Sequence, residues 1–281
     1  IGSHHHDIAI SAGEYADFMP KSMWFLEEPI ATASTVAFYK VCELARQHVK
    51  VVLTGQGADE PFAGYLRHFG ERWGGYYRSL PEAVRNYLIA PLVEMLPRNE
   101  RLKRAVRSLN IPDALHRFCL VHSIFHSSLR KKLYLKEVGD RVVNHCSDVF
   151  QQWLADVGHL DHLSQLLYID SRFSLADNLL MYGDKLSMAV SLEARVPFLD
   201  LDLMQFVESI PPQYKIKGFT QKYILKKAVA KWVPPHVLTR KKIGFTTPVD
   251  EWFRREMRVY LSDKMLSTDS ISSIYFNKKT I

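Results

Sequence analysis

The amino-acid sequence predicts an α/β fold in which part of a twisted parallel sheet is flanked by helices and followed by a large helical portion. Residues 49–53 form an apolar, β-branched run that is typical of a strand buried on both faces of a parallel sheet. An amphipathic helical pattern begins at Ser34 and leads directly into that run. Helical spacing, broken by glycines and prolines, prevails from residue 66 to about 165. Strands and helices in this order indicate a layered α/β domain.

The segment before residue 34 predicts one more strand and one more helix. Ile8-Ala9-Ile10 is expected to form a short strand, and the residues from Glu14 to Leu26 carry aromatic side chains at helical spacing, with Pro20 inside the pattern. Glu28-Pro29 predicts a loop, because a residue that precedes proline is excluded from the α region. A strand, a helix and a second strand at residues 49–53 would together make a βαβ unit.

A polar, glycine-containing stretch follows the strand and reads Thr54-Gly55-Gln56-Gly57-Ala58-Asp59-Glu60-Pro61. Its glycines can adopt positive φ and let the backbone approach a ligand closely, and Pro61 suits the first turn of a helix. A strand, a glycine turn and a helix start predict an anion site at the carboxyl edge of the sheet. Because bare carboxylates would repel a phosphate, Asp59 and Glu60 indicate a bridging hard cation, Mg²⁺.

The composition is that of a globular protein, with 281 residues of which 47% are hydrophobic and 24% are charged. The three cysteines, Cys42, Cys119 and Cys146, lie far apart, which argues against a disulfide framework and a zinc site and favours a reducing compartment. The sequence has neither a secretory leader pattern nor an apolar run near the roughly 20 residues that a membrane span needs. We therefore expect a cytoplasmic protein without a membrane partner.

The net charge of +7 fits nucleotide phosphates, RNA or a solvated basic surface. The most basic segment, from Arg101 to Arg107, is better interpreted as a solvated helix face than as an RNA-binding element. His122 and His126 could share a helix face, but the sequence offers no third ligand nearby, so a metal site there is not expected.

Two further stretches are dense in polar residues. Residues 184–200 read Asp-Lys-Leu-Ser-Met-Ala-Val-Ser-Leu-Glu-Ala-Arg-Val-Pro-Phe-Leu-Asp and predict a helix that ends near Ser191, followed by an extended segment. Glu193 and Arg195 can either pair with each other or contact a substrate. In the second stretch, Lys222 falls in the first turn of a predicted helix, where its charge opposes the helix dipole, so it requires an anionic partner.

These motifs together resemble the synthetase domain of glutamine-dependent asparagine synthetases, which belong to the pyrophosphate-loop ATP pyrophosphatases. Residues 54–65, Thr-Gly-Gln-Gly-Ala-Asp-Glu-Pro-Phe-Ala-Gly-Tyr, are similar to the second signature loop of that family, and residues 184–200 are similar to its most extended motif. Glu28-Pro29 resembles the loop that borders the family's cleft, and residues 240–245 resemble the element that closes the domain. Residues 2–6 resemble a native segment of the family and also a cleaved tag, and both interpretations stay open.

The resemblance implies a pyrophosphate-loop ATPase type of sheet and a set of site residues. It implies that Asp59 and Glu60 bind Mg²⁺ and that Lys222 reaches the phosphates and the transferred group. Gln56 takes a catalytic position where many family members carry an acid. The residues expected to bind ATP and pyrophosphate are Thr54, Gly55, Gly57, Asp184 and Lys185.

The activity that the resemblance implies is amide formation that depends on ATP and Mg²⁺. The carboxylate of aspartate would be adenylated, and ammonia from glutamine would then displace AMP to give asparagine. Such chemistry relies on positioning and charge neutralisation. Three alternatives stay open. They are an amide ligase that acts on another carboxylate, an RNA-modifying relative, which the basic charge permits but the asparagine-synthetase motifs argue against, and a binding module without catalysis.

The family's Ser-Gly-Gly-x-Asp-Ser loop, which cradles pyrophosphate, does not occur in residues 1–281, and the sequence has no glutaminase domain. The resemblance therefore implies that residues 1–281 are a synthetase domain truncated at both ends. We expect this chain alone to be inactive and to need the missing glutaminase domain as a partner. A homodimer stays open.

Overall fold

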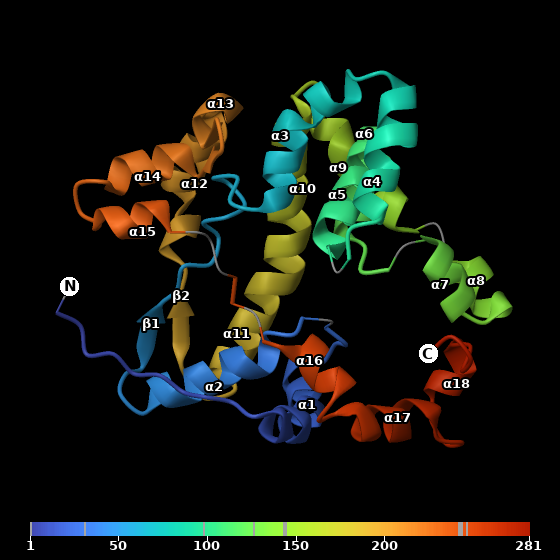
Figure 1. Ribbon diagram of the computed structural model, residues 1–281. Coiled ribbons are helices and arrows are strands. Elements are labelled where there is room, and N and C mark those ends of the chain that lie inside the picture. Colours follow the sequence, from blue (N-terminus) through green and yellow to red (C-terminus); the bar gives the residue numbers. More distant parts are fainter. Residues whose placement is uncertain are drawn as a thin grey trace.

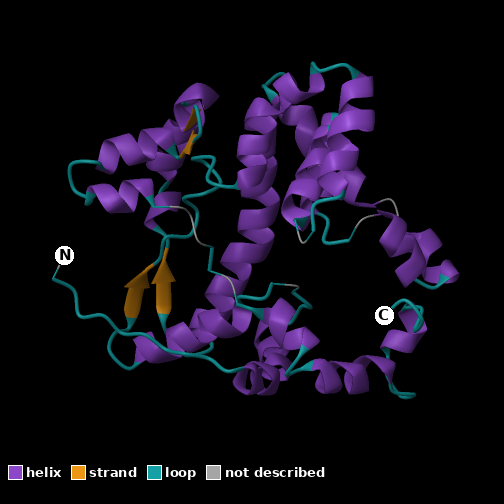
Figure 2. Cartoon of the chain, viewed as in Figure 1, coloured by secondary structure: helices purple, strands orange, loops and turns teal. Residues whose placement is uncertain are grey.

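The computed structural model describes residues 2–30, 32–97, 99–125, 127–142, 145–240, 244–245 and 247–281. The fold is mostly helical (Figure 2) and is built around a continuous helical rod. The rod consists of α10 (His162–Asp170), the π-helix η2 (Ser171–Leu180) and α11 (Met181–Met188), and it runs obliquely through the middle of the molecule in Figure 1. Side chains of the rod enter all three hydrophobic clusters of the core. The rod is therefore the element that joins the rest of the structure.

The first helix, α1 (Ala12–Leu26), packs with α2 (Thr35–Arg46) against α11. It begins at Ser11, whose hydroxyl accepts from the Glu14 backbone N–H while the Glu14 carboxylate accepts from the Ser11 N–H, a reciprocal cap. Pro20 lies inside α1 without ending it. The rings of Phe18 and Tyr39 stack with centroids 4.1 Å apart in the cluster that these helices share. Both predicted helices are confirmed.

The sheet at the site has two strands, β1 (Val51–Leu53) and β2 (Glu193–Arg195), within the described residues. They pair in parallel, with Val52 opposite Ala194, and lie side by side in Figure 1. The parallel strand predicted at residues 49–53 is confirmed, but its burial on both faces is wrong, because the Leu53 side chain is 74% exposed. In the described part of the chain, the face of β1 that carries Leu53 is therefore not covered by a helix layer, as a strand inside a parallel sheet would be.

Two sequence predictions in this region are wrong. Residues 8–10 form no strand and are mostly exposed, since no neighbouring strand pairs with their backbone among the described residues, so the βαβ unit is not formed there. Pro61 does not begin a helix. It lies in a turn that the Gly64 N–H closes by donating to the Asp59 carbonyl over 2.7 Å, and α3 starts only at Leu66.

The helical prediction for residues 66 to 165 is confirmed. Phe118, Phe150, Leu166 and Ile169 form the cluster that joins this portion to the rod. Its helices are α3 (Leu66–Arg78), η1 (Val84–Ile89), α4 (Ala90–Glu94), α5 (Glu100–Leu109), α6 (Ala114–His122), α7 (Ser127–Leu133), α8 (Lys136–Val142) and α9 (His145–Val157).

After β2, the chain first forms helices on one side of the rod and then continues to the opposite side, where it ends (Figure 1). A backbone bridge between Tyr134 and Phe276 places the chain end beside α7 and α8. Nowhere in the described part of the chain does a helix combine the length and the apolar composition that crossing a membrane requires. The elements are η3 (Pro197–Leu199), α12 (Leu201–Ser209), α13 (Pro212–Lys215), β3 (Ile216–Lys217), β4 (Thr220–Gln221), α14 (Tyr223–Val229), α15 (Pro235–Thr239), α16 (Val249–Arg254), α17 (Arg258–Leu266) and α18 (Ser272–Tyr275).

A buried carboxylate, Asp170, ties α3 and α6 to the rod. Arg67 Nε donates to Asp170 Oδ2 over 2.8 Å, His68 Nε2 donates to the same oxygen, and His122 Nε2 lies 2.5 Å from Oδ1. Burial alone would raise the pKa of Asp170, but the hydrogen bonds from His122 and His68 hold that pKa well below its usual value. Burial lowers the pKa of His68. Its Nδ1 accepts from the Tyr65 N–H, which is consistent with a neutral ring.

We expect the stability of the fold to decrease as the pH falls below about 6.5, the ordinary pKa of His68 in the unfolded chain. The unfolded histidine binds a proton in this range, whereas the folded ring resists protonation, so acid favours unfolding. Asp170 acts in the same direction at lower pH, because its folded pKa is also lowered. Urea-unfolding midpoints between about pH 7.5 and 5.5 measure the slope, and His68→Gln should reduce it. Equal slopes in the two proteins would contradict this assignment.

Candidate active site

The loop after β1 is a compact turn held by its own backbone. The Thr54 N–H donates to the Arg195 carbonyl over 2.8 Å, which extends the pairing between β1 and β2. Gly57 has φ +78°, and a Cβ built there would lie 2.3 Å from Leu199, so this position requires glycine for both reasons. At Gly55 a Cβ would meet no described atom within 4 Å. Of the two glycines that flank Gln56, Gly57 is therefore needed for the backbone conformation of the turn, whereas the surroundings of Gly55 have room for a side chain.

Asp59 and Lys222 form an ion pair at this loop. Lys222 Nζ lies 2.9 Å from Asp59 Oδ1, and both side chains are partly exposed. Lys222 is the residue that precedes α14, and its backbone has φ 52°, in the left-handed region. The prediction that Lys222 has an anionic partner is confirmed. Because the two residues come from distant segments, the pair joins the loop after β1 to the β3–β4 hairpin.

Gly64 lets this ion pair approach the backbone closely. A Cβ built on Gly64 would lie 1.8 Å from Asp59 Oδ1 and 2.3 Å from Lys222 Cε, which real atoms do not tolerate. The sequence interpretation singled out the glycines that flank Gln56 and missed Gly64, because its role depends on a residue more than a hundred positions away.

We expect Gly64→Ala to separate Asp59 from Lys222, because the ends of these two side chains can rotate away from the added methyl group. The protein should be destabilised by up to about 1 kcal/mol, the scale of losing a partly exposed ion pair. Thermal or urea unfolding measures the loss. Gly70→Ala in α3 is the matched control, because a Cβ at Gly70 meets no described atom within 4 Å, and it should stabilise the helix slightly. Similar midpoints for the two variants would contradict the steric argument.

Glu60 lies in a different environment from its neighbour Asp59. Its side chain is 0% exposed, and the Tyr65 hydroxyl donates to its Oε1 over 2.5 Å. Burial raises the pKa of Glu60. The described residues contain no cluster of three His, Cys, Asp or Glu side chains suited to a metal. Because Mg²⁺ usually keeps several waters and binds substrate phosphates, the partly exposed Asp59 carboxylate fits this ion. Glu60, whose buried Oε2 accepts no hydrogen bond from the described residues, stays a predicted second ligand.

Gln56 packs against the rod where η2 meets α11. Its Nε2 donates to the Leu179 carbonyl over 3.3 Å, and a Cβ on Gly183 would lie 3.0 Å from its Oε1. The absence of a side chain at Gly183 therefore makes room for the carboxamide. The structure thus brings Gln56 close to the residue that precedes Asp184, a proximity that the sequence does not reveal.

Lys185 extends from the rod to the end of α1. Its Nζ donates to the Leu26 carbonyl over 2.7 Å and to Glu27 over 2.8 Å, while the preceding residue of α11, Asp184, is exposed. Side-chain hydrogen bonding to Lys185 lowers the pKa of Glu27. Glu27 was not among the predicted site residues. Its place beside the Glu-Pro dipeptide is the signal that could have found it.

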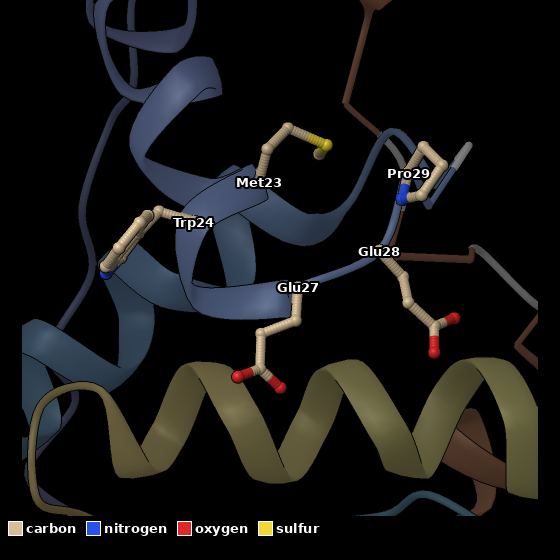
Figure 3. A pocket seen from close by; sticks show the side chains of 5 residues that line it. All are labelled: Met23, Trp24, Glu27, Glu28 and Pro29. Carbon is tan, nitrogen blue, oxygen red and sulfur yellow. The ribbon is translucent and has the colours of Figure 1, made fainter.

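A hollow of about 530 Å³ lies at the end of α1. The loop predicted at Glu28-Pro29 is confirmed and lines this hollow. Figure 3 shows its lining side chains pointing in different directions, with Glu27 directed toward α11. It therefore lacks a convergent set of polar groups. The lining residues are Met23, Trp24, Glu27, Glu28 and Pro29.

Two other predicted features have simple outcomes. Arg195 Nε donates to Glu193 Oε1 over 2.7 Å, so the pairing alternative is the one that the structure shows. The basic element at residues 240–245 includes residues 241–243, which lie outside the described residues. The pair formed by His122 and His126 includes residue 126, which also lies outside them.

Comparison with known proteins gives a consistent result. Residues 1–281 match the family model described as asparagine synthase. The asparagine synthetase [glutamine-hydrolyzing] 1 of Bacillus subtilis is 31% identical over 269 residues, which cover 96% of this chain and 42% of that protein. A putative asparagine synthetase [glutamine-hydrolyzing] of Mycobacterium bovis is 34% identical over 90% of this chain and 38% of its own length.

A more distant relative carries another name. The amidase chyE of Penicillium rubens is 25% identical over 90% of this chain and 40% of its own length. The chain thus spans about two fifths of the length of these curated relatives.

Proposed function

Because the chain belongs to the asparagine synthase family, we propose that the protein containing it forms an amide from a carboxylate at the expense of ATP, with aspartate as the acceptor. The observation that carries this proposal is the Asp59–Lys222 pair, 2.9 Å apart at the loop that follows the parallel strand β1. An ammonium group at the carboxyl edge of a parallel strand suits the binding of phosphates, and the carboxylate beside it suits the Mg²⁺ that would accompany them.

The proposed reaction has two steps. The aspartate side-chain carboxylate attacks the α-phosphorus of ATP, the bond to pyrophosphate breaks, and β-aspartyl-adenylate forms. Ammonia, derived from glutamine, then attacks the activated carbonyl and loses a proton, and AMP leaves with the bonding electron pair. Neither step needs a protein nucleophile, so the role of the chain is to position substrates and to neutralise charge.

The residues divide these tasks. Lys222 would place its ammonium group near the phosphates and the adenylyl group that is transferred, and Thr54, Gly55 and Gly57 would supply the loop against which ATP binds. The open space at Gly55 supports this placement. Mg²⁺, when bound, supplies charge neutralisation at the phosphates, and Asp59 is the side chain that would hold it. We also assign Asp184 and Lys185 to the ATP site: they follow Gly183, which lies against Gln56, and Lys185 itself bonds to the end of α1.

Two assays on the full-length protein test the function. ATP–pyrophosphate exchange that requires aspartate reports the first step. Equal amounts of AMP and asparagine formed from ATP, aspartate and ammonia report the second. Exchange that no carboxylate stimulates would contradict an adenylating ligase, and salt-sensitive RNA binding in its place would favour an RNA-modifying relative.

A second candidate is a related amide ligase that acts on another carboxylate. Gln56 favours it, because this position carries no acid here and the side chain is engaged with the rod. AMP release that depends on a different carboxylic acid, without asparagine, would distinguish this candidate from the first.

A further inference from the structure

The ion pair between Asp59 and Lys222 is part of a closed ring of contacts. Asp59 is followed by Glu60, which accepts from the Tyr65 hydroxyl over 2.5 Å. Lys222 is preceded by Gln221, whose Nε2 donates to the Tyr65 carbonyl over 2.6 Å. Tyr65 thus contacts the neighbour of each member of the pair, one through its side chain and the other through its backbone.

Tyr65 is itself held firmly at the start of α3. Its N–H donates to His68 Nδ1 over 3.3 Å, and the Arg67 guanidinium lies 4.1 Å from its ring centroid. Both His68 and Arg67 bond to the buried Asp170. Burial raises the pKa of Tyr65, so its hydroxyl remains a donor. The ring of contacts is therefore connected to the rod through the buried carboxylate of Asp170.

The hairpin that carries Lys222 has two other contacts with α3. Trp73 Nε1 donates to the Gly218 carbonyl over 3.1 Å, and the rings of Phe69 and Phe219 stack with centroids 5.9 Å apart. These contacts orient the hairpin as a whole. Gln221 acts at the residue next to Lys222, where the left-handed backbone of Lys222 needs support from its surroundings.

We propose that Tyr65 and Gln221 are positioning residues that fix the Lys222 ammonium group against Asp59. Glu60 in this arrangement holds the Tyr65 hydroxyl in the interior, which explains why it is buried while Asp59 is partly exposed. The geometric part of the inference stands on the contacts alone, and its kinetic part rests on the proposed function.

The geometric part is tested by amine labelling of Lys222, which needs no activity. Gln221→Met keeps the length of the side chain and removes the donor to the Tyr65 carbonyl. Labelling by acetic anhydride, followed by mass spectrometry, should show Lys222 reacting about two- to fivefold faster than in wild type, because local opening exposes the amine. Lys226 and Lys227 serve as internal references. Gln213→Met, an exposed glutamine in α13, is the matched control and should leave the rate unchanged. An unchanged rate in Gln221→Met would overturn the proposal.

The kinetic part is tested by coupling in the full-length protein. Gln221→Met should lower the kcat of ATP–pyrophosphate exchange about tenfold with little change in the KM for ATP, because a displaced charge mainly affects the transition state. In a Lys222→Met background the same substitution should cost less than about twofold, since it acts through Lys222.

An equal loss in both backgrounds would show a merely structural role and overturn the proposal. Tyr65→Phe, which removes the hydroxyl alone, should also lower kcat in the wild-type background and have little effect in the Lys222→Met background. Tyr214→Phe, at an exposed tyrosine, is its control. If Tyr65→Phe does not fold because Glu60 loses its donor, Gln221→Met still decides the result. If the wild-type protein shows no exchange, the proposed function fails and the labelling experiment still decides the positioning.

Discussion

Replacing Asp59 with asparagine in the full-length protein is expected to lower ATP–pyrophosphate exchange by about 10²- to 10³-fold, the scale of losing one preorganised charge at a reacting group. The substitution keeps the shape of the side chain but removes the charge that pairs with Lys222 at 2.9 Å. It also removes the carboxylate that would hold Mg²⁺. Measurement of kcat and KM for ATP at several Mg²⁺ concentrations separates binding from chemistry.

The control for this substitution is Asp17→Asn, since Asp17 is an exposed carboxylate on α1. Any glutamine hydrolysis by the protein should be unchanged in Asp59→Asn, because that activity would use a separate domain. Loss of both activities together would indicate a folding role for Asp59. Retention of full exchange would show that this carboxylate has no part in the reaction.

Replacing Gln56 with glutamate is expected to lower amide formation by about tenfold to 100-fold near neutral pH, on the scale of removing one oriented hydrogen bond near the reacting group. The Gln56 amide donates to the Leu179 carbonyl, whereas a carboxylate would place one oxygen against another. It would also place a charge in a partly buried site beside the rod. Formation of asparagine and AMP, followed together with ammonia as nitrogen source, measures the effect, and the exposed Gln47→Glu is the matched control.

The opposite outcome for Gln56 would be equally informative. The attacking ammonia must lose a proton in the second step, and a glutamine side chain cannot accept one. If asparagine appears only in Gln56→Glu, then this position requires a base, and the chain as it stands is not part of a working asparagine synthetase. Release of AMP without asparagine would indicate an amide ligase with a different acceptor.

Local signals in the sequence were sufficient for several parts of this protein. Hydrophobic periodicity predicted α1, α2 and the helical portion after residue 66, because helix amphipathicity is written in neighbouring residues. The β-branched run predicted β1 as a parallel strand. The charge of Lys222 at a helix start predicted an anionic partner, which the structure identifies as Asp59.

The tertiary structure decided what depends on distant contacts. Residues 8–10 have the composition of a strand but no partner strand among the described residues, and Pro61 has the chemistry of a helix start but lies inside a closed turn. Asp59 and Glu60 are adjacent in sequence, yet one pairs with Lys222 and the other is enclosed with Tyr65.

The difference between the features that the sequence predicted and those that the tertiary structure decided has a physical reason. Periodicity, capping and turn preference are properties of a few consecutive residues, so the sequence by itself determined the main helices, one parallel strand and the family resemblance of the loops. Burial, ion pairing and steric limits depend on which segments meet after folding. Only the tertiary structure decided that a side chain at Gly64 would displace the ion pair, that Gln56 contacts the rod, and that Tyr65 and Gln221 connect the two members of the ion pair.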